Sequence, residues 1–190
     1  MLIEPKNVVL KNGQSVMLKS PEPSDADKLL QHLKVVFGES YMNMNHPSNH
    51  WDNFPVTDEE KILTDFVASS SKFMVSAFYE DRIVGNLGFF GSVGEFLKHN
   101  ARLGMGIEKK FCGIGLGSAL LKHALNQGQK LKFHRVELTV RAFNEAGIKL
   151  YEKIGFERVG LLKDAAFIDG RYCDEYMYQI LLRSDQGDKL

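Results

Sequence analysis

The first half of the chain combines one short strand with two amphipathic helices. Residues 15–20 (SVMLKS) predict a strand, and Ser24 is a candidate cap for the helix that follows it. In that helix, apolar side chains recur at helical spacing at Leu29, Leu30, Leu33, Val36 and Phe37. A second helix is predicted to begin at Thr57, with Glu60 completing a capping box, and to end at about Ser70.

After the second helix the pattern changes to strands around a glycine-rich turn. Residues 72–92 predict two strands joined at Glu80–Asp81, and residues 100–110 predict a third. A helix is expected from the glycine stretch to about Gln127. The regular alternation of apolar and polar side chains over residues 134–140 predicts the next strand.

The last part of the chain predicts a helix and then a hairpin. Asn144 caps the helix over residues 144–156, Gly155 ends it, and Phe156 suits the apolar contact beyond a C-terminal glycine. Asp169–Gly170 between two strand-like runs is a strong two-residue hairpin signal. The predicted order, β α α β β β α β α β β, indicates an α/β fold with a sheet of mixed direction.

Composition and charge exclude several classes of function. The 190 residues suit one domain, which we take as residues 1–190 with a core at about 15–182. The 24 Lys and Arg residues balance the 24 Asp and Glu residues, so neither nucleic acid nor a membrane is an expected partner. The cysteines, Cys112 and Cys173, are too few for a disulfide scaffold and lack metal-ligand spacing. Free thiols favour the cytoplasm.

Gly113, Gly115 and Gly117 alternate directly before a predicted helix. Glycine costs conformational entropy, so this spacing needs a reason, either a sharp turn or the close approach of a ligand to bare backbone. A helix N-terminus offers unpaired N–H groups, so the stretch is typical of an anion cradle. The P-loop pattern fails because Ser118 and Ala119 follow Gly117, and the dinucleotide pattern G-x-G-x-x-G fails as well. A glycine-rich turn without a ligand remains an alternative for this stretch alone.

The motif GIGLGSALL (113–121), followed by NEAGIKLYEKIGF (144–156), resembles the GNAT N-acetyltransferase superfamily. The resemblance covers roughly residues 15–182. The family's cradle Q/R-x-x-G-x-G/A, which grips the pyrophosphate of acetyl-CoA, matches Cys112, Gly115 and Gly117. Its later motif N-x-x-A-x-x-L-Y matches Asn144, Gly147, Leu150 and Tyr151.

The resemblance implies a fold and a co-substrate. The expected fold is a mixed, mostly antiparallel central sheet of about six to seven strands with helices on both faces. The expected co-substrate is acetyl-CoA, without a metal, held by Ile107, Cys112, Gly113, Gly115, Gly117, Ser118 and Asn144. Cys112 replaces the usual Gln or Arg, which we expect to reduce affinity without abolishing it, because most of the cradle is backbone. Gly147 replaces the usual Ala and loosens the helix by roughly 1 kcal/mol.

The resemblance also implies direct attack of an amine on the acetyl thioester through a tetrahedral intermediate. In the family, a backbone N–H on the strand before the cradle stabilises the oxyanion, and Met105 or a neighbour on residues 103–107 is the candidate here. Tyr151 matches the family's general acid, with a core aromatic side chain as the alternative. Arg102 stands where many relatives carry Glu. The base is left open among Glu39, Glu80 and Glu95, each of which also fits a solvated surface carboxylate.

In this fold the acceptor is expected between the first two helices and the last hairpin, at residues 39–56 and 165–176. The hairpin is similar to a branch that holds ribosomal-protein N-terminal and polyamine acetyltransferases, through Asp169, Gly170, Tyr172 and Asp174. The expected acceptor is therefore a primary amine, on a small molecule or a peptide N-terminus. A non-catalytic acyl-CoA-binding sensor or interaction module stays open as an alternative, as does a homodimer.

The loop at residues 39–56 allows several roles for its side chains. His46 and His50 are four residues apart, but Pro47 between them argues against a helix and a metal site. Aromatic side chains either wall a pocket or pin the loop to the core, namely Tyr41, Trp51 and Phe54. The acidic residues Asp52, Asp58, Glu59 and Glu60 favour a solvated helix start over attraction of a cationic amine.

Overall fold

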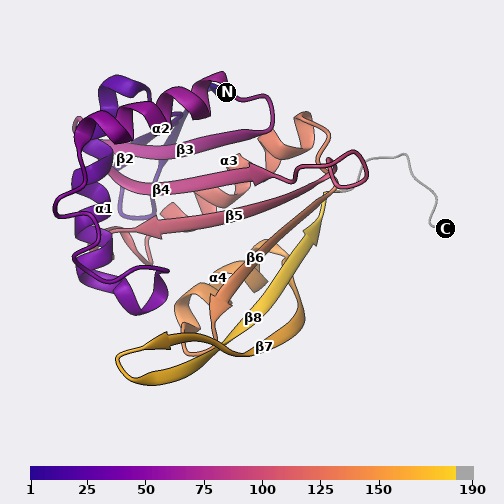
Figure 1. The fold of residues 1–190 in the computed structure, drawn as a ribbon. Helices are drawn as coiled ribbons and strands as arrows, with labels where there is room; N and C mark the ends of the chain where they lie inside the picture. Colours follow the sequence, from indigo (N-terminus) through magenta and orange to yellow (C-terminus); the bar gives the residue numbers. More distant parts are fainter. Residues whose placement is uncertain (183–190) are drawn as a thin grey trace.

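A single mixed sheet of eight strands organises the computed structural model, which describes residues 1–182 (Figure 1). Its order is β1-β2-β3-β4-β5-β6-β8-β7. All neighbouring strands are antiparallel except β5 and β6, which are parallel. The strands are β1 (Lys6–Val9), β2 (Ser15–Lys19), β3 (Lys72–Tyr79), β4 (Arg82–Gly91), β5 (Asn100–Ile107), β6 (Arg135–Arg141), β7 (Glu157–Ile168) and β8 (Arg171–Leu181).

Helices cover both faces of the sheet, as the resemblance implied (Figure 1). The helices are α1 (Ala26–Ser40), α2 (Val56–Ala68), α3 (Leu116–Lys130) and α4 (Glu145–Ile154), with short 3-10 turns η1 (Pro23–Asp25), η2 (Tyr41–Asn43) and η3 (Lys109–Phe111). On one face, α1 approaches so closely that a Cβ on Gly106 would lie 3.0 Å from Val36 Cγ1. On the other face, a Cβ on Gly85 would lie 3.1 Å from Leu120 Cδ1 of α3. None of the helices in the described residues is long and apolar enough to cross a membrane.

Two cores result from this arrangement. The larger core lies between the sheet and α3 and includes Leu116, Leu120 and Leu121, all fully buried. The smaller core joins α1 and α2, through Leu29 and Leu63, to strands β3 and β4. The central strands β3 and β4 are buried almost continuously along their length, because apolar layers cover both faces of the sheet there.

The signals for the two hairpin turns and for both ends of α4 are confirmed. Glu80 and Asp81 both have positive φ (47° and 64°) in the β3–β4 turn, and Asp169 and Gly170 (48° and 80°) form the β7–β8 turn. Positive φ at both central positions matches the twist of a hairpin. Asn144 caps α4 through a hydrogen bond from the Gly147 amide to Asn144 Oδ1 (3.0 Å), and Gly155 ends the helix with φ 106°.

Three sequence predictions are wrong in detail. The sheet has eight strands rather than six to seven, because β1 forms an additional edge strand. α1 begins after Asp25, not Ser24, because η1 precedes it and Glu22 and Asp25 cap each other reciprocally. α2 begins after Pro55, and no side-chain cap forms there, so the capping box from Thr57 to Glu60 does not exist.

Candidate active site

The parallel strands β5 and β6 pair only at their beginnings. The paired positions are Asn100 with Arg135, Ala101 with Val136, and Arg102 with Glu137. At the last pair, Arg102 Nε donates to Glu137 Oε1, and Arg135 Nη2 lies 2.7 Å from Glu137 Oε2. Beyond this ion-paired position β5 stays with β4 while β6 follows β8, so the strands diverge (Figure 1).

Two backbone amides of β5 point into the gap that opens where β6 diverges from β5. Ser92 N donates to Asn100 O (2.8 Å) and Glu108 N donates to Val84 O (3.2 Å), so the even-numbered residues of β5 bond to β4. Because antiparallel pairs alternate, the amides of Met105 and Ile107 point away from β4. In the described residues, β6 pairs with β5 only at 100–102. Both amides therefore face the opening between the strands.

The glycines of the cradle meet different demands. Gly113 and Gly115 have φ values of 76° and 98°, which side chains disfavour. A Cβ on Gly113 would meet nothing within 4 Å, so its surroundings are open. A Cβ on Gly117 would lie 2.7 Å from Leu150 Cδ2 and 3.2 Å from Ile107 Cδ1, so Gly117 lets α3 pack against α4 and β5.

The N-terminus of α3 is suited to an anion. Gly115 is its N-cap residue, no side chain caps it, and its first turn has no acidic residue. A cavity of about 470 Å³ adjoins this helix end and is lined by Gly115 and Ser118 together with four lysines, Lys6, Lys11, Lys122 and Lys153. The amide of Lys11 also donates to Ile114 O (3.0 Å), which docks the β1–β2 turn onto the cradle. An uncapped helix N-terminus and positive charge together suit the binding of phosphate groups.

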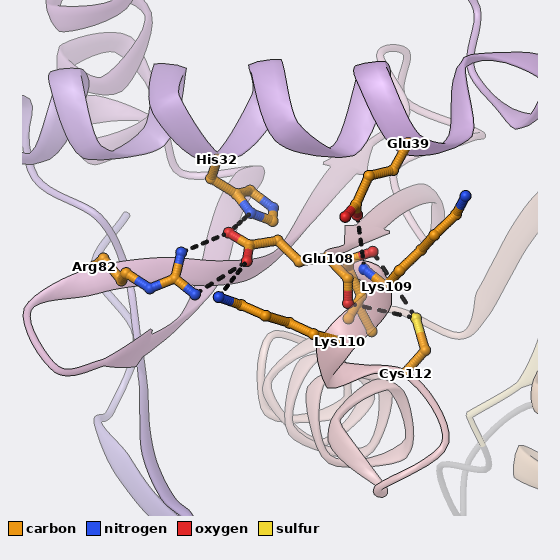
Figure 2. Close-up of polar contacts among 8 residues, drawn as sticks. His32, Glu39, Arg82, Glu108, Lys109, Lys110 and Cys112 are labelled. Atoms are coloured by element: carbon orange, nitrogen blue, oxygen red, sulfur yellow. Dashed lines mark hydrogen bonds and ion pairs between the residues drawn. The ribbon is translucent and has the colours of Figure 1, made fainter.

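The junction between β5 and the cradle is held by charged side chains from other elements (Figure 2). Glu39 Oε2, at the end of α1, accepts a hydrogen bond from Lys109 N (2.7 Å). Glu108 is 2% exposed and accepts from both Arg82 Nη1 and Arg82 Nη2 at 3.1 Å. His32 Nδ1 lies 3.6 Å from Glu108 Oε1. Sequence reasoning missed Arg82, Glu108 and His32, because they are distant in the chain or follow no motif.

Cys112 takes the position of the usual Gln or Arg without extending a charge into the site. Its thiol lies 3.9 Å from Ile107 O and 3.6 Å from Glu108 O, back toward β5 (Figure 2). Burial, together with the negative charge of Glu39, raises the pKa of the thiol. Cys112 is therefore a neutral thiol at neutral pH and adds no charge to the cradle.

Helix α4 brings Asn144 and Tyr151 to the same side of the sheet as the cradle. A Cβ on Gly147 would lie 2.9 Å from Asn144 Nδ2, so the glycine gives the capping side chain room to fold back. Tyr151 is 8% exposed and packs edge-on against Phe156, with ring centroids 5.9 Å apart. Burial raises the pKa of Tyr151 to about 12. Tyr151 is thus both a core aromatic side chain and a neutral phenol.

A second cavity lies where the acceptor was expected. It has a volume of about 350 Å³ and is lined by Tyr41, Arg141 and residues 44–47 and 166–169. Tyr41 donates its hydroxyl hydrogen bond to Asp169 Oδ2 (2.7 Å), which joins the two sides of the cavity. Tyr41 therefore walls the pocket, one of the two roles that the sequence left open.

Arg141 holds the acceptor loop to the end of β6. It is 5% exposed and forms an ion pair with Glu175 of β8. Its guanidinium also donates to Met42 O (3.4 Å) and Met44 O (3.0 Å). Arg141 thereby fixes the position of the loop relative to the hairpin, and no sequence motif had indicated it.

The remaining aromatic side chains of the loop pin it to α1. Trp51 packs edge-on against Phe37 (5.7 Å between ring centroids) and Phe54 (5.0 Å). His46 and His50 stack face to face at 4.0 Å. In the described residues no group of three or more His, Cys, Asp or Glu side chains could hold a metal ion.

None of the three candidate bases is clearly placed for catalysis. Glu95 pairs with Lys98 (2.6 Å) in the connection before β5, at the end away from the cradle. Glu80 lies in the β3–β4 turn, and Glu39 is engaged at the amide of Lys109. Glu59 differs from the expected solvated helix start, because it is 2% exposed and burial raises its pKa to about 7.

Comparison with known proteins gives a consistent result. Residues 39–156 match the family model described as the acetyltransferase (GNAT) family. The L-amino acid N-acetyltransferase AaaT of Escherichia coli is 27% identical, over 85% of this chain and 94% of that protein. The [ribosomal protein uS5]-alanine N-acetyltransferase of E. coli is 28% identical, over 72% of this chain and 76% of that protein. The crystal structure of a GNAT-family acetyltransferase from Streptococcus pneumoniae has a TM-score of 0.83 at 27% identity, covering 88% of this chain and 99% of that chain.

Proposed function

Because the chain belongs to the acetyltransferase (GNAT) family, we propose that it transfers an acetyl group from acetyl-CoA to a primary amine in the opening between β5 and β6. The observation that carries the proposal is the pair of outward amides at Met105 and Ile107, directly before a glycine turn and an uncapped helix end. Acetyl-CoA supplies the activated acetyl thioester. We treat residues 1–190 as one domain acting in the cytoplasm, where Cys112 and Cys173 stay reduced.

Each part of the site has a proposed role in holding the co-substrate. The amides of Gly113, Gly115 and Ser118 bind the pyrophosphate at the N-terminus of α3. The lysines of the adjoining cavity add positive charge for the remaining phosphate. The Ile107 amide pairs with the pantetheine chain in place of a strand, Asn144 orients it from the start of α4, and the Met105 amide donates to the oxygen of the acetyl group.

Tyr151 is the proposed general acid for the leaving thiol. Its pKa of about 12 exceeds the 8.5 of a thiol in water, so unaided transfer is uphill by roughly 5 kcal/mol. Burial of the thiol in the same opening raises the thiol pKa as well and narrows the gap. Tyr151→Phe should lower kcat by roughly 10²–10⁴-fold with little change in KM for acetyl-CoA. Full turnover with an unchanged pH profile would contradict the role.

The cavity between the loop at residues 41–47 and the β7–β8 hairpin is the proposed acceptor site. The carboxylate of Asp169 lines it and accepts only the hydrogen bond of Tyr41 among the described residues, so it can attract a cationic amine. Arg141 lines it too, but its charge is balanced by Glu175. Similarity to the AaaT and uS5-alanine enzymes supports a free amino acid or a peptide N-terminus as the acceptor class.

Hydrogen exchange tests the binding mode without relying on turnover. In the free protein the amides of Gly104 and Gly106, which bond to β4, should exchange slowly, and those of Met105 and Ile107 should exchange quickly. Acetyl-CoA should slow the second pair and leave the first unchanged. A rise in Tm with acetyl-CoA, without this change at Met105 and Ile107, would place binding elsewhere.

Thiol release tests the reaction. Acetyl-CoA is offered with separate pools of polyamines, amino acids, aminoglycosides and peptides of varied N-termini. Release above the rate without acceptor identifies the acceptor class. If acetyl-CoA protects Met105 and Ile107 but no pool gives release, the result favours the alternative of a non-catalytic acyl-CoA-binding module.

A further inference from the structure

We propose that Glu108 is a positioning residue for the cradle, whose buried carboxylate fixes the direction in which the chain leaves β5 and enters the glycine turn. This inference rests on the proposed function, since the cradle is the site proposed for acetyl-CoA. Glu108 makes no contact that belongs to the reaction itself. It lies between Ile107, whose amide faces the opening, and the turn that leads to Gly113.

Arg82, the first residue of β4, forms a bidentate ion pair with Glu108, which we call the two-pronged contact. Arg82 Nη1 donates to Glu108 Oε1 and Arg82 Nη2 donates to Glu108 Oε2, each at 3.1 Å (Figure 2). The Arg82 guanidinium also lies 5.7 Å from the ring centroid of buried Phe111, the last residue of η3. Arg82 therefore contacts the residue before η3 and the residue that ends it, which restrains the whole turn before Cys112 and Gly113.

Helix α1 contacts the same junction at two points. His32 and Glu39 lie seven residues apart, two turns along one face of α1. Glu39 accepts from the Lys109 amide, and the fully buried ring of His32 faces Glu108 with Nδ1 3.6 Å from Oε1. Among the described residues, neither ring nitrogen of His32 has a hydrogen-bond partner. His32 therefore adds a polar contact to the Glu108 carboxylate from α1, just beyond hydrogen-bond distance.

Opposing effects act on the pKa of the Glu108 carboxylate. Burial acts to raise the pKa of Glu108, but the neighbouring His32 and Arg82 outweigh it and hold the pKa below its usual value. Lys110 Nζ adds a more distant positive charge, 4.0 Å from Oε2. A buried ion pair adds little to stability compared with an apolar replacement of the same volume. Its use here is geometric, because the two-pronged contact fixes both the distance and the plane of the carboxylate.

Glu108→Gln keeps the volume and removes the charge. We expect it to raise the Kd for acetyl-CoA, measured by calorimetry, and KM for acetyl-CoA by about tenfold each, as when groups that orient a binding site are removed. The KM of the acceptor should stay unchanged. The matched control is Glu59→Gln, which alters an equally buried glutamate (2% exposed) on α2 and should bind acetyl-CoA as the wild type does.

Two further variants separate positioning from stability. Arg82→Lys, at a side chain that is 40% exposed, keeps the charge but not the two-pronged contact, and should reproduce the loss of affinity even if Glu108→Gln fails to fold. The double variant Glu108→Gln with Arg82→Gln removes both charges. It should regain Tm relative to Glu108→Gln without regaining affinity.

The outcomes divide cleanly. Three results would each overturn the inference. The first is wild-type affinity for acetyl-CoA in both Glu108→Gln and Arg82→Lys, and the second is an equal loss of affinity in Glu108→Gln and Glu59→Gln. The third is a double variant in which affinity for acetyl-CoA returns together with Tm. A wild-type protein that shows no protection of Met105 and Ile107 by acetyl-CoA would instead overturn the proposed function.

Discussion

Glu59 imposes a pH-dependent cost on stability that can be measured without any substrate. It lies in the first turn of α2, is 2% exposed, and burial raises its pKa from 4.5 to about 7. Between these two pH values the folded protein keeps a proton that the unfolded chain has released, so the free energy of unfolding falls as pH rises. The full cost, reached above the folded pKa, is about 3 kcal/mol. Of this, about 2.5 kcal/mol develops between pH 5 and pH 8.

Glu59→Gln removes the ionisable group at nearly constant volume. Urea unfolding of the wild type and the variant at pH 5 and pH 8 should show the stability of the variant, relative to the wild type, rising by about 2.5 kcal/mol between the two conditions. Glu60→Gln changes the exposed neighbour on the same helix and should show almost no such rise. An equal difference at both pH values for Glu59→Gln would refute the raised pKa and the burial that causes it.

Three further substitutions test the cap, the acceptor loop and the cradle. Asn144→Ala removes the cap bond to the Gly147 amide and should cost about 1 kcal/mol of unfolding free energy; an unchanged urea midpoint would contradict the capping role. Arg141→Met leaves the half-buried Glu175 without its ion-pair partner and should cost about 3 kcal/mol of unfolding free energy, with a raised KM for the acceptor. A raised KM for acetyl-CoA alone would argue against the place of Arg141 in the acceptor loop. Cys112→Arg should tighten the Kd for CoA, and calorimetry that shows no gain would count against reduced affinity in the wild type.

The features predicted correctly from the sequence are those that depend on neighbouring residues. The Asp169–Gly170 turn, the Asn144 cap and the Gly155 stop each need a backbone conformation that few residue types adopt. These conformations are largely independent of tertiary contacts. The order of the helices and central strands followed from the same local signals, combined with apolar periodicity.

The errors arose where no periodic signal marked an element, where two local caps competed, or where distant packing decides the structure. Strand β1 (KNVV) is an edge strand with no buried residue, so no alternation of apolar and polar positions marked it. The start of α1 is set by the reciprocal pair Glu22 and Asp25, which favours η1 over a cap at Ser24. Glu59 looked like an exposed acid at a helix start, but the packing of α2 buries it.

In the candidate active site, too, some features follow from the local sequence and others depend on contacts between distant residues. Met105 could be proposed from its place before the cradle, and the outward direction of its amide follows from the alternation of bonds with β4. The point where β5 and β6 part could not be read from the sequence, because it depends on which positions of the two strands pair, and the last pair is Arg102 with Glu137. Arg102, which stands where many relatives carry Glu, is therefore part of the last connection before the opening.

The alternating glycines of the cradle form one sequence motif, but they are needed for two different physical reasons, positive φ and space for packing. Gly113 and Gly115 are needed for positive φ, so a side chain there strains the backbone whatever the ligand. Gly117 is needed for space, because a Cβ would meet Leu150 of α4. Leu150 lies one residue before Tyr151, so the packing at Gly117 also sets how α4 approaches α3. Gly117, which belongs to the cradle motif, thereby helps to place the proposed general acid on α4, and this gives a physical reason for the two motifs to occur together.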